Sequence, residues 1–155
     1  MPTQPDFNLE AAHRYFSADC FNRTWEFIEK TSRTPEEEEE MLRLCFASHY
    51  HWTQRPDCTA SNLSIGYWPI SRVFALLGQA DKARRYAQRC LEASQSEGVE
   101  PALLGYAYEA LARAELIAGN RDKAQDYIEK AHQAAVREPD PEDRRLLLAD
   151  LASLV

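Results

Sequence analysis

Two side chains with the spacing of a metal site lie one helical turn apart in the stretch CFASHYHW, residues 45–52. Cys45 and His49 are four residues apart, and this spacing places two ligands on one face of a helix, as in helical zinc sites. His51 does not share that face, because residues two apart in a helix point about 160° away from each other. Two further ligands would have to come from Cys20, Cys58 or His13.

The same helix face also fits a hydrophobic core. One apolar stripe is formed by Met41, Cys45, His49 and Trp52. A buried thiol behaves as a small hydrophobe, and a single imidazole in a core hydrogen-bonds a neighbour. We therefore expect core packing at these positions and no cofactor, with metal binding by Cys45 and His49 as an alternative.

The composition is that of an ordinary soluble domain. The 155 residues are 45% hydrophobic and 28% charged, and only 5 glycines leave little material for turn-rich β architecture. The net charge of −7 argues against nucleic-acid binding, which needs clustered Lys and Arg. The sequence shows neither the pattern of a signal peptide nor an apolar run of about 18 residues. We expect a cytoplasmic protein with no membrane contact and with reduced cysteines.

Motifs typical of enzymes do not occur in the sequence. It has no Gly-rich phosphate loop, no nucleophile elbow, no HExxH and no paired CxxC. We therefore predict a protein that is not an enzyme and has no catalytic residues.

The segments that are expected to form helices and to position these side chains repeat along the chain. At an offset of 41 residues, the segment 66–94 aligns with the segment 107–135. The identical positions are Tyr67/Tyr108, Arg72/Arg113, Gly78/Gly119, Asp81/Asp122, Lys82/Lys123, Ala83/Ala124, Tyr86/Tyr127 and Ala93/Ala134. Self-similarity at such a period indicates stacked helix pairs, each of which buries its apolar side on its neighbours.

Each copy contains the signals of a helical hairpin. Gly78 and Gly119 are expected to end the first helix of each pair, because glycine adopts the left-handed conformation without a Cβ penalty. A polar turn follows. The second helix of the second copy then has small or apolar residues at 124, 127, 128, 131, 134 and 135, the stripe of one buried face.

These hairpins resemble the tetratricopeptide-repeat family. The resemblance depends on a Gly five residues before an Ala, in Gly78 with Ala83 and in Gly119 with Ala124, and on small residues further along the second helix such as Ala131. It covers about residues 60 to 136, although the period of 41 exceeds the usual 34. The resemblance implies an all-α, right-handed α-α superhelix of about three hairpins.

We divide the chain into one repeat domain over residues 1–155. A divergent hairpin over 8–54 precedes the repeats 59–97 and 101–137, and a capping helix over 140–154 follows them. Thr34 with Glu37 forms a capping box around Pro35 at the start of one helix, and Asp140 with Pro141 starts the last helix. The last helix is expected to dock through Leu147, Leu148, Leu151 and Leu154.

In the resembled family the leading helices of the hairpins line a concave groove that takes a peptide or another helix. The alignment places Trp68, Arg72, Tyr106, Glu109 and Arg113 on this wall, and Asn22 and Glu26 extend it from the first hairpin. Glu109 and Arg113 have the spacing of an ion pair on one helix. We predict a non-catalytic scaffold that binds a protein or peptide of unknown identity, with self-association into a homodimer as a further alternative.

Overall fold

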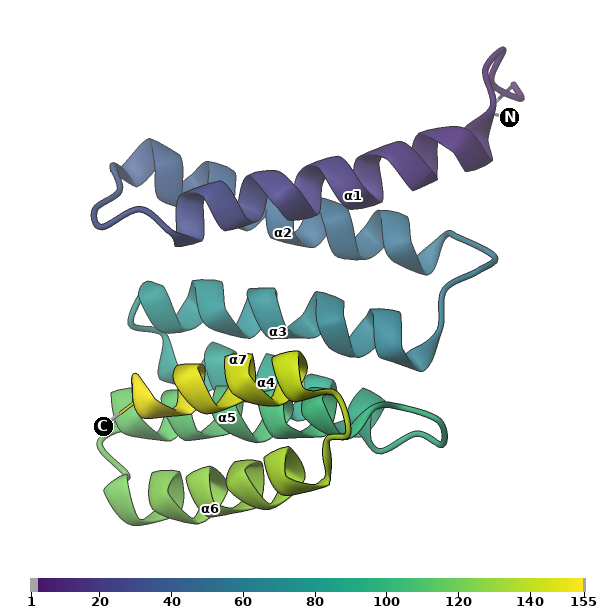
Figure 1. Ribbon diagram of the computed structural model, residues 1–155. Coiled ribbons are helices and arrows are strands. Elements are labelled where there is room, and N and C mark those ends of the chain that lie inside the picture. The colour runs from purple at the N-terminus through teal and green to yellow at the C-terminus, as the bar shows by residue number, and fades with distance from the viewer. Residues whose placement is uncertain (1–2, 155) are drawn as a thin grey trace.

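The computed structural model describes residues 3–154, and over this range it contains seven helices and no strands (Figure 1). The helices are α1 (Leu9–Ile28), α2 (Pro35–Thr53), α3 (Ala60–Leu76), α4 (Ala80–Ser94), α5 (Pro101–Ala118), α6 (Arg121–Arg137) and α7 (Pro141–Ala152). The predicted all-α class is confirmed. The helices lie within the predicted segments, and the division of the chain into repeat units stays a prediction.

Polar side chains fix where several of the helices begin. The Thr34 hydroxyl accepts a hydrogen bond from the Glu37 backbone N–H, and the Glu37 carboxylate accepts one from Thr34 N–H, so the predicted capping box is confirmed. Thr59 and Asn62 make the equivalent box on α3. Asp140 accepts bonds from two N–H groups in the first turn of α7, as predicted.

Glycines in the left-handed conformation end α3 and α5. Gly78 has φ +72° and Gly119 has φ +84°. At each one, the next residue donates a backbone hydrogen bond across the helix end, from Gln79 N to Phe74 O at 2.9 Å and from Asn120 N to Glu115 O at 2.8 Å. The two turns have the same geometry, so the matched sequences at these positions form matched structures.

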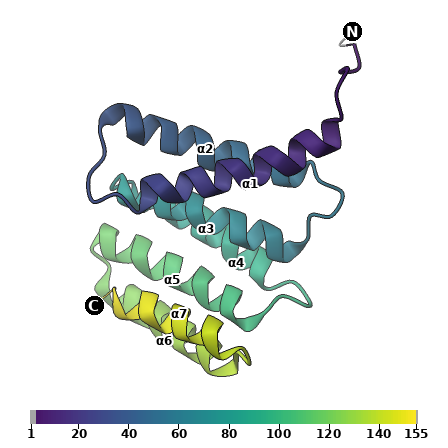
Figure 2. The same ribbon diagram turned by 45° about the horizontal axis from the view of Figure 1, so that its top comes forward.

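The helices pack as antiparallel pairs in an array (Figure 2). Within the pairs α1 contacts α2, α3 contacts α4, and α5 contacts α6, while α2 contacts α3 and α4 contacts α5 between pairs. The odd-numbered helices also contact one another, α1 with α3, α3 with α5, and α5 with α7. Within residues 3–154 no close backbone contacts join α2 to α4 or α4 to α6, and α2 reaches α4 through side chains, with 5.6 Å between the ring centroids of Phe46 and Tyr86. None of these helices is long and apolar enough to cross a membrane.

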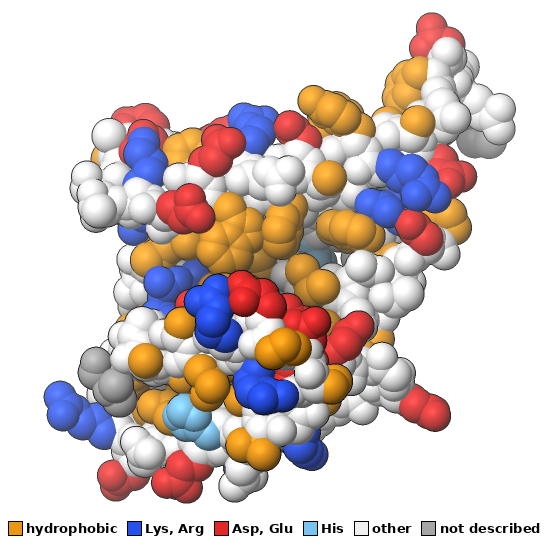
Figure 3. Space-filling view, viewed as in Figure 1, with side chains coloured by type: hydrophobic (Ala, Val, Ile, Leu, Met, Phe, Trp, Pro, Cys, Tyr) orange, Lys and Arg blue, Asp and Glu red, His pale blue; other side chains and the backbone are white. Residues whose placement is uncertain are grey.

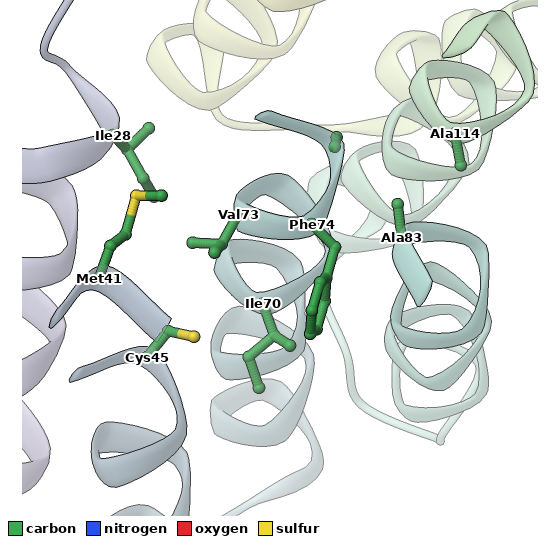
Figure 4. Packing of buried hydrophobic residues seen from close by; sticks show 9 residues of the cluster. Ile28, Met41, Cys45, Ile70, Val73, Phe74, Ala83 and Ala114 are labelled. Carbon is green, nitrogen blue, oxygen red and sulfur yellow. The ribbon is translucent and has the colours of Figure 1, made fainter. Parts of the chain in front are cut away.

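The largest core cluster joins the first two helix pairs (Figure 4). Cys45 of α2 points toward α3, Val73 of α3 points back toward α2, and the Met41 side chain extends to Ile28 of α1. Met41, Ile70 and Val73 are fully buried. Cys45 is therefore a core residue, as the apolar stripe predicts. The cluster also reaches α4 and α5 through alanines, whose small side chains let neighbouring helices approach closely.

The last helix covers the third pair by inserting two leucines. Leu147 and Leu151 are buried, and Leu154 packs beside them. A Cβ on Gly105 of α5 would collide with Leu147, so the lack of a side chain at Gly105 makes room for this contact. The prediction that Leu148 packs with them is wrong, because Leu148 lies one residue and about 100° further around the helix and is 38% exposed.

Candidate ligand groove between the leading helices

A pocket of about 210 Å³ opens between α1 and α7, with α3 and α5 at its base. Five helices contribute side chains to it. The lining residues are Phe21 and Trp25 from α1, Ser64, Ile65, Trp68 and Pro69 from α3, Cys90 from α4, Leu103 and Tyr106 from α5, and Asp150 from α7. Figure 3 shows hydrophobic side chains gathered between α1 and α7, with charged side chains along the α7 side.

Aromatic rings form one wall of the pocket. The Trp25 and Trp68 rings are stacked, with 5.4 Å between their centroids and 12° between their planes. Tyr106 meets Trp68 edge-on at 6.0 Å. Ring pairs of this kind contribute about 0.5–1.5 kcal/mol beyond their buried area, so the wall is held in place before any ligand arrives.

A buried carboxylate fixes the position of Trp68. Glu109 on α5 is fully buried, and its Oε2 accepts a 2.8 Å hydrogen bond from the Trp68 indole N–H. Its Oε1 accepts two bonds from the Arg113 guanidinium, at 3.0 Å and 2.5 Å. Burial raises the pKa of Glu109, while Arg113 and the indole N–H act against this rise. The predicted Glu109–Arg113 pair is therefore present, and Glu109 positions Trp68 and Arg113 from beneath the groove surface.

Two arginines line a second hollow beyond the aromatic wall. Arg72 on α3 and Arg113 on α5 line this hollow of about 220 Å³, which Leu154 and Ser153 close from the C-terminal side. Arg113 forms an ion pair with Glu109. Arg72 is partly buried and forms neither a hydrogen bond nor an ion pair with any residue in the described part of the chain, although Glu109 and Asp150 are near enough to influence its pKa. Burial and the neighbouring Arg113 lower that pKa.

The structure brings together most of the wall residues predicted from the sequence. Trp68 and Tyr106 line the first hollow, and Arg72 and Arg113 line the second. Glu109 is buried beneath these residues, where it accepts hydrogen bonds from Trp68 and Arg113.

The first helix contributes different residues from those predicted. Asn22 and Glu26 are exposed on α1 beside the pocket, and its wall there is made by Phe21 and Trp25. These two aromatics are one helical turn apart, and a stripe of large apolar residues left facing outward was the signal that could have identified them.

Asp150 was also not predicted. It reaches the pocket from α7, where it lies beside Tyr106. Burial raises the pKa of Tyr106, and Asp150 raises it further. The phenol is neutral at physiological pH and can donate a hydrogen bond to Asp150 or to a ligand.

The side chains suggested for a metal site do not converge. Cys45 is buried in the core, where its Sγ donates to Leu42 O at 3.2 Å. His49 packs against Tyr67 with 4.2 Å between ring centroids, and its buried Nδ1 has no hydrogen-bond partner within residues 3–154. Over the same residues, no three His, Cys, Asp or Glu side chains form a group that could hold a metal ion.

A histidine pair at the open end of the first hairpin was not predicted. His13 of α1 and His51 of α2 approach through their Nδ1 atoms at 2.8 Å. Partial burial and the neighbouring imidazole lower the pKa of His51. The two rings lie beside Phe16 and Tyr50, so the contact between the imidazoles is part of an aromatic cluster.

No protein-family model matches the chain, and neither a curated protein nor a solved structure matches it.

Proposed function

We propose that the protein is a non-catalytic scaffold that binds a segment of another protein in the groove between α1 and α7. In this proposal the three helix pairs form a right-handed superhelix of the tetratricopeptide type, with α1, α3 and α5 on its concave face and α7 as the cap. The observation that carries the proposal is the pocket lined by Trp25, Trp68 and Tyr106, which remains open to solvent although its walls are largely apolar.

The helix contacts support a concave face on this side. Close backbone contacts join the odd-numbered helices to one another, but within residues 3–154 no close backbone contact joins α2 to α4 or α4 to α6. When the helices of an array are closer together on one side, the array curves and that side becomes concave. This difference supports the proposal that the leading helices line the inside of a bend, the side on which stacked repeats build their extended binding surfaces.

The size of the pocket favours a side chain as its occupant. Sites for small molecules and cofactors usually enclose about 300–1,000 Å³, and this pocket has about 210 Å³. A hollow of that volume accommodates one large apolar side chain. A second hollow lies at Arg72, one turn of α3 beyond Trp68, and two neighbouring hollows suit a ligand that is longer than the first pocket, such as a peptide segment.

The titratable groups of the pocket favour binding over covalent chemistry. Burial raises the pKa of the Cys90 thiol to about 11, so it remains protonated and weakly nucleophilic at neutral pH. The raised pKa of Tyr106 likewise keeps its phenol protonated. These groups offer packing surface and hydrogen bonds to a ligand.

The test is selection from a random-peptide display library on the intact protein, followed by affinity measurement on two variants. Ile65 lines the pocket and is 42% exposed, so Ile65→Glu puts a charge into the hollow without opening the core. We expect selected peptides to lose about tenfold or more in affinity, because an apolar anchor would meet a carboxylate.

Val136→Glu is the matched control, since Val136 is an aliphatic residue on α6 and is 80% exposed. It should leave the affinity unchanged. Failure to enrich any peptide, or equal binding to both variants, would contradict the proposed function.

A further inference from the structure

We infer that the groove recognises an acidic segment in which an Asp or Glu side chain follows or precedes a large apolar anchor by two residues, with Arg72 as its ion-pair partner. This inference rests on the proposed function, because it names the chemistry of the segment that the groove takes. The anchor occupies the hollow at Trp25 and Trp68, and the carboxylate lies one turn of α3 further along.

The first step is the lack of an ion-pair partner for Arg72 among the described residues. The charged groups that influence Arg72 are Arg113, Glu109, Asp150 and Arg33. Arg113 and Glu109 are paired with each other, and Arg33 donates to the carbonyls of Phe27 and Lys30. Asp150 lies near enough to influence Arg72 but forms no ion pair with it within the described residues. Arg72 therefore has no ion-pair partner among the described residues, although it lines the hollow beside Arg113.

The second step is the cost of leaving such a cation unpaired. A guanidinium stays charged in proteins, and partial burial removes some of its hydration without supplying an acceptor. A ligand carboxylate would supply two acceptor oxygens in the fork geometry that suits arginine. The chain as a whole carries a net charge of −7, so general electrostatic attraction does not explain a preference for acidic ligands. A preference of the groove for acidic ligands would therefore come from a local positive charge, and Arg72 supplies it.

The third step is the spacing. Arg72 follows Trp68 by four residues of α3, which places it about 6 Å further along the helix axis. An extended peptide advances about 6.6 Å over two residues, and side chains two apart point the same way. An anchor over Trp68 and a carboxylate at Arg72 are therefore spanned by two residues of extended chain.

The same peptide selection tests this inference, with the enriched sequences compared between the intact protein and Arg72→Gln. We expect an apolar residue with Asp or Glu two positions away, and about tenfold weaker binding of these peptides to Arg72→Gln. Replacing the acid by its amide in the peptide should cause the same loss on the intact protein and no further loss on Arg72→Gln. Arg72→Lys should restore part of the affinity, because it keeps the charge but not the fork.

Arg85→Gln is the matched control, because Arg85 is an exposed arginine on the back of α4. It should bind the peptides as the intact protein does. Enriched peptides that carry an apolar anchor but no acidic preference, or an acidic preference that survives in Arg72→Gln, would overturn the inference and leave the proposed function standing. Phenylacetate is an aromatic carboxylate without a peptide backbone. If it bound with the same affinity as the enriched peptides, that result would also overturn the inference. A selection without any enriched peptide would remove the proposed function itself.

Discussion

Replacing Arg113 by methionine is expected to destabilise the protein through the carboxylate that it leaves behind. Methionine keeps most of the length and packing of the arginine stem, but it cannot donate hydrogen bonds. The buried Glu109 would then keep one bond, from Trp68, and lose both bonds from the guanidinium. Breaking a buried pair by removing one partner typically costs about 3–5 kcal/mol.

We expect about 3 kcal/mol at pH 7, the lower end of that range. The Arg113 side chain is 17% exposed, so water enters part of the space it leaves, and Trp68 still satisfies one carboxylate oxygen. For a chain of this size, 1 kcal/mol corresponds to about 2–4 °C in Tm, so the variant should melt about 6–12 °C lower. The double variant Arg113→Met with Glu109→Gln should recover at least about 1 kcal/mol, because it removes the buried charge.

The cost should shrink as the pH falls. Burial already raises the pKa of Glu109, and Arg113 acts against this rise, so removing Arg113 raises the pKa further. A folded-state pKa above the unfolded value of about 4.3 means that the folded state binds the proton more tightly. Stability is then lost as the pH rises from the unfolded pKa through the folded pKa, and the penalty is smallest when Glu109 is protonated.

Urea unfolding of wild type, Arg113→Met and the double variant at pH 4 and pH 7, followed by circular dichroism and tryptophan fluorescence, measures these differences. Agreement between the two probes establishes that one transition is observed. The variant is compared with wild type at each pH, so that other titrating groups cancel. A loss below about 1 kcal/mol at pH 7, an equal loss at both values of pH, or no recovery in the double variant would refute the reasoning.

The remaining predictions concern packing and turns, and thermal unfolding measures all of them. Leu147→Ala should cost about 2–5 kcal/mol because Leu147 is fully buried, whereas Leu148→Ala, its exposed neighbour, should cost less than about 0.5 kcal/mol; similar losses would show that α7 is not docked through Leu147. Gly119→Ala should cost about 1 kcal/mol or more because its φ is +84°, and an unchanged Tm would mean that α5 ends differently. Gly66→Ala would bring a Cβ to 2.7 Å from His49 Nδ1 and should cost about 1–3 kcal/mol, unless α2 and α3 are further apart than described.

The features that the sequence predicted well have local causes. The capping box at Thr34 and the glycine turns after α3 and α5 each depend on residues within about six positions of one another. The Glu109–Arg113 pair lies within one helical turn. In such cases the geometry of one helix fixes which groups meet, so spacing alone is sufficient.

The features that it missed depend on how separate helices align. Trp25 meets Trp68 only because α1 lies against α3 in one particular register, and Asp150 reaches Tyr106 only because α7 folds back over α5. The meeting of His13 and His51 is of the same kind. A shift of one residue turns a helix by about 100°, and the difference between buried Leu147 and exposed Leu148 shows how much such a shift changes.

The buried Glu109 links the shape of the groove to its charge. The carboxylate holds the Trp68 indole on one side and the Arg113 guanidinium on the other, so the aromatic wall and the cationic end of the groove share one anchor. Because Arg113 neutralises Glu109, Arg72 is left as the cation without a partner within residues 3–154. A ligand carboxylate at Arg72 would then experience little net repulsion from Glu109. If Arg72 instead of Arg113 paired with Glu109, the aromatic wall would keep its shape. The unpaired guanidinium would then no longer lie one turn of α3 beyond Trp68, where it selects an acidic residue.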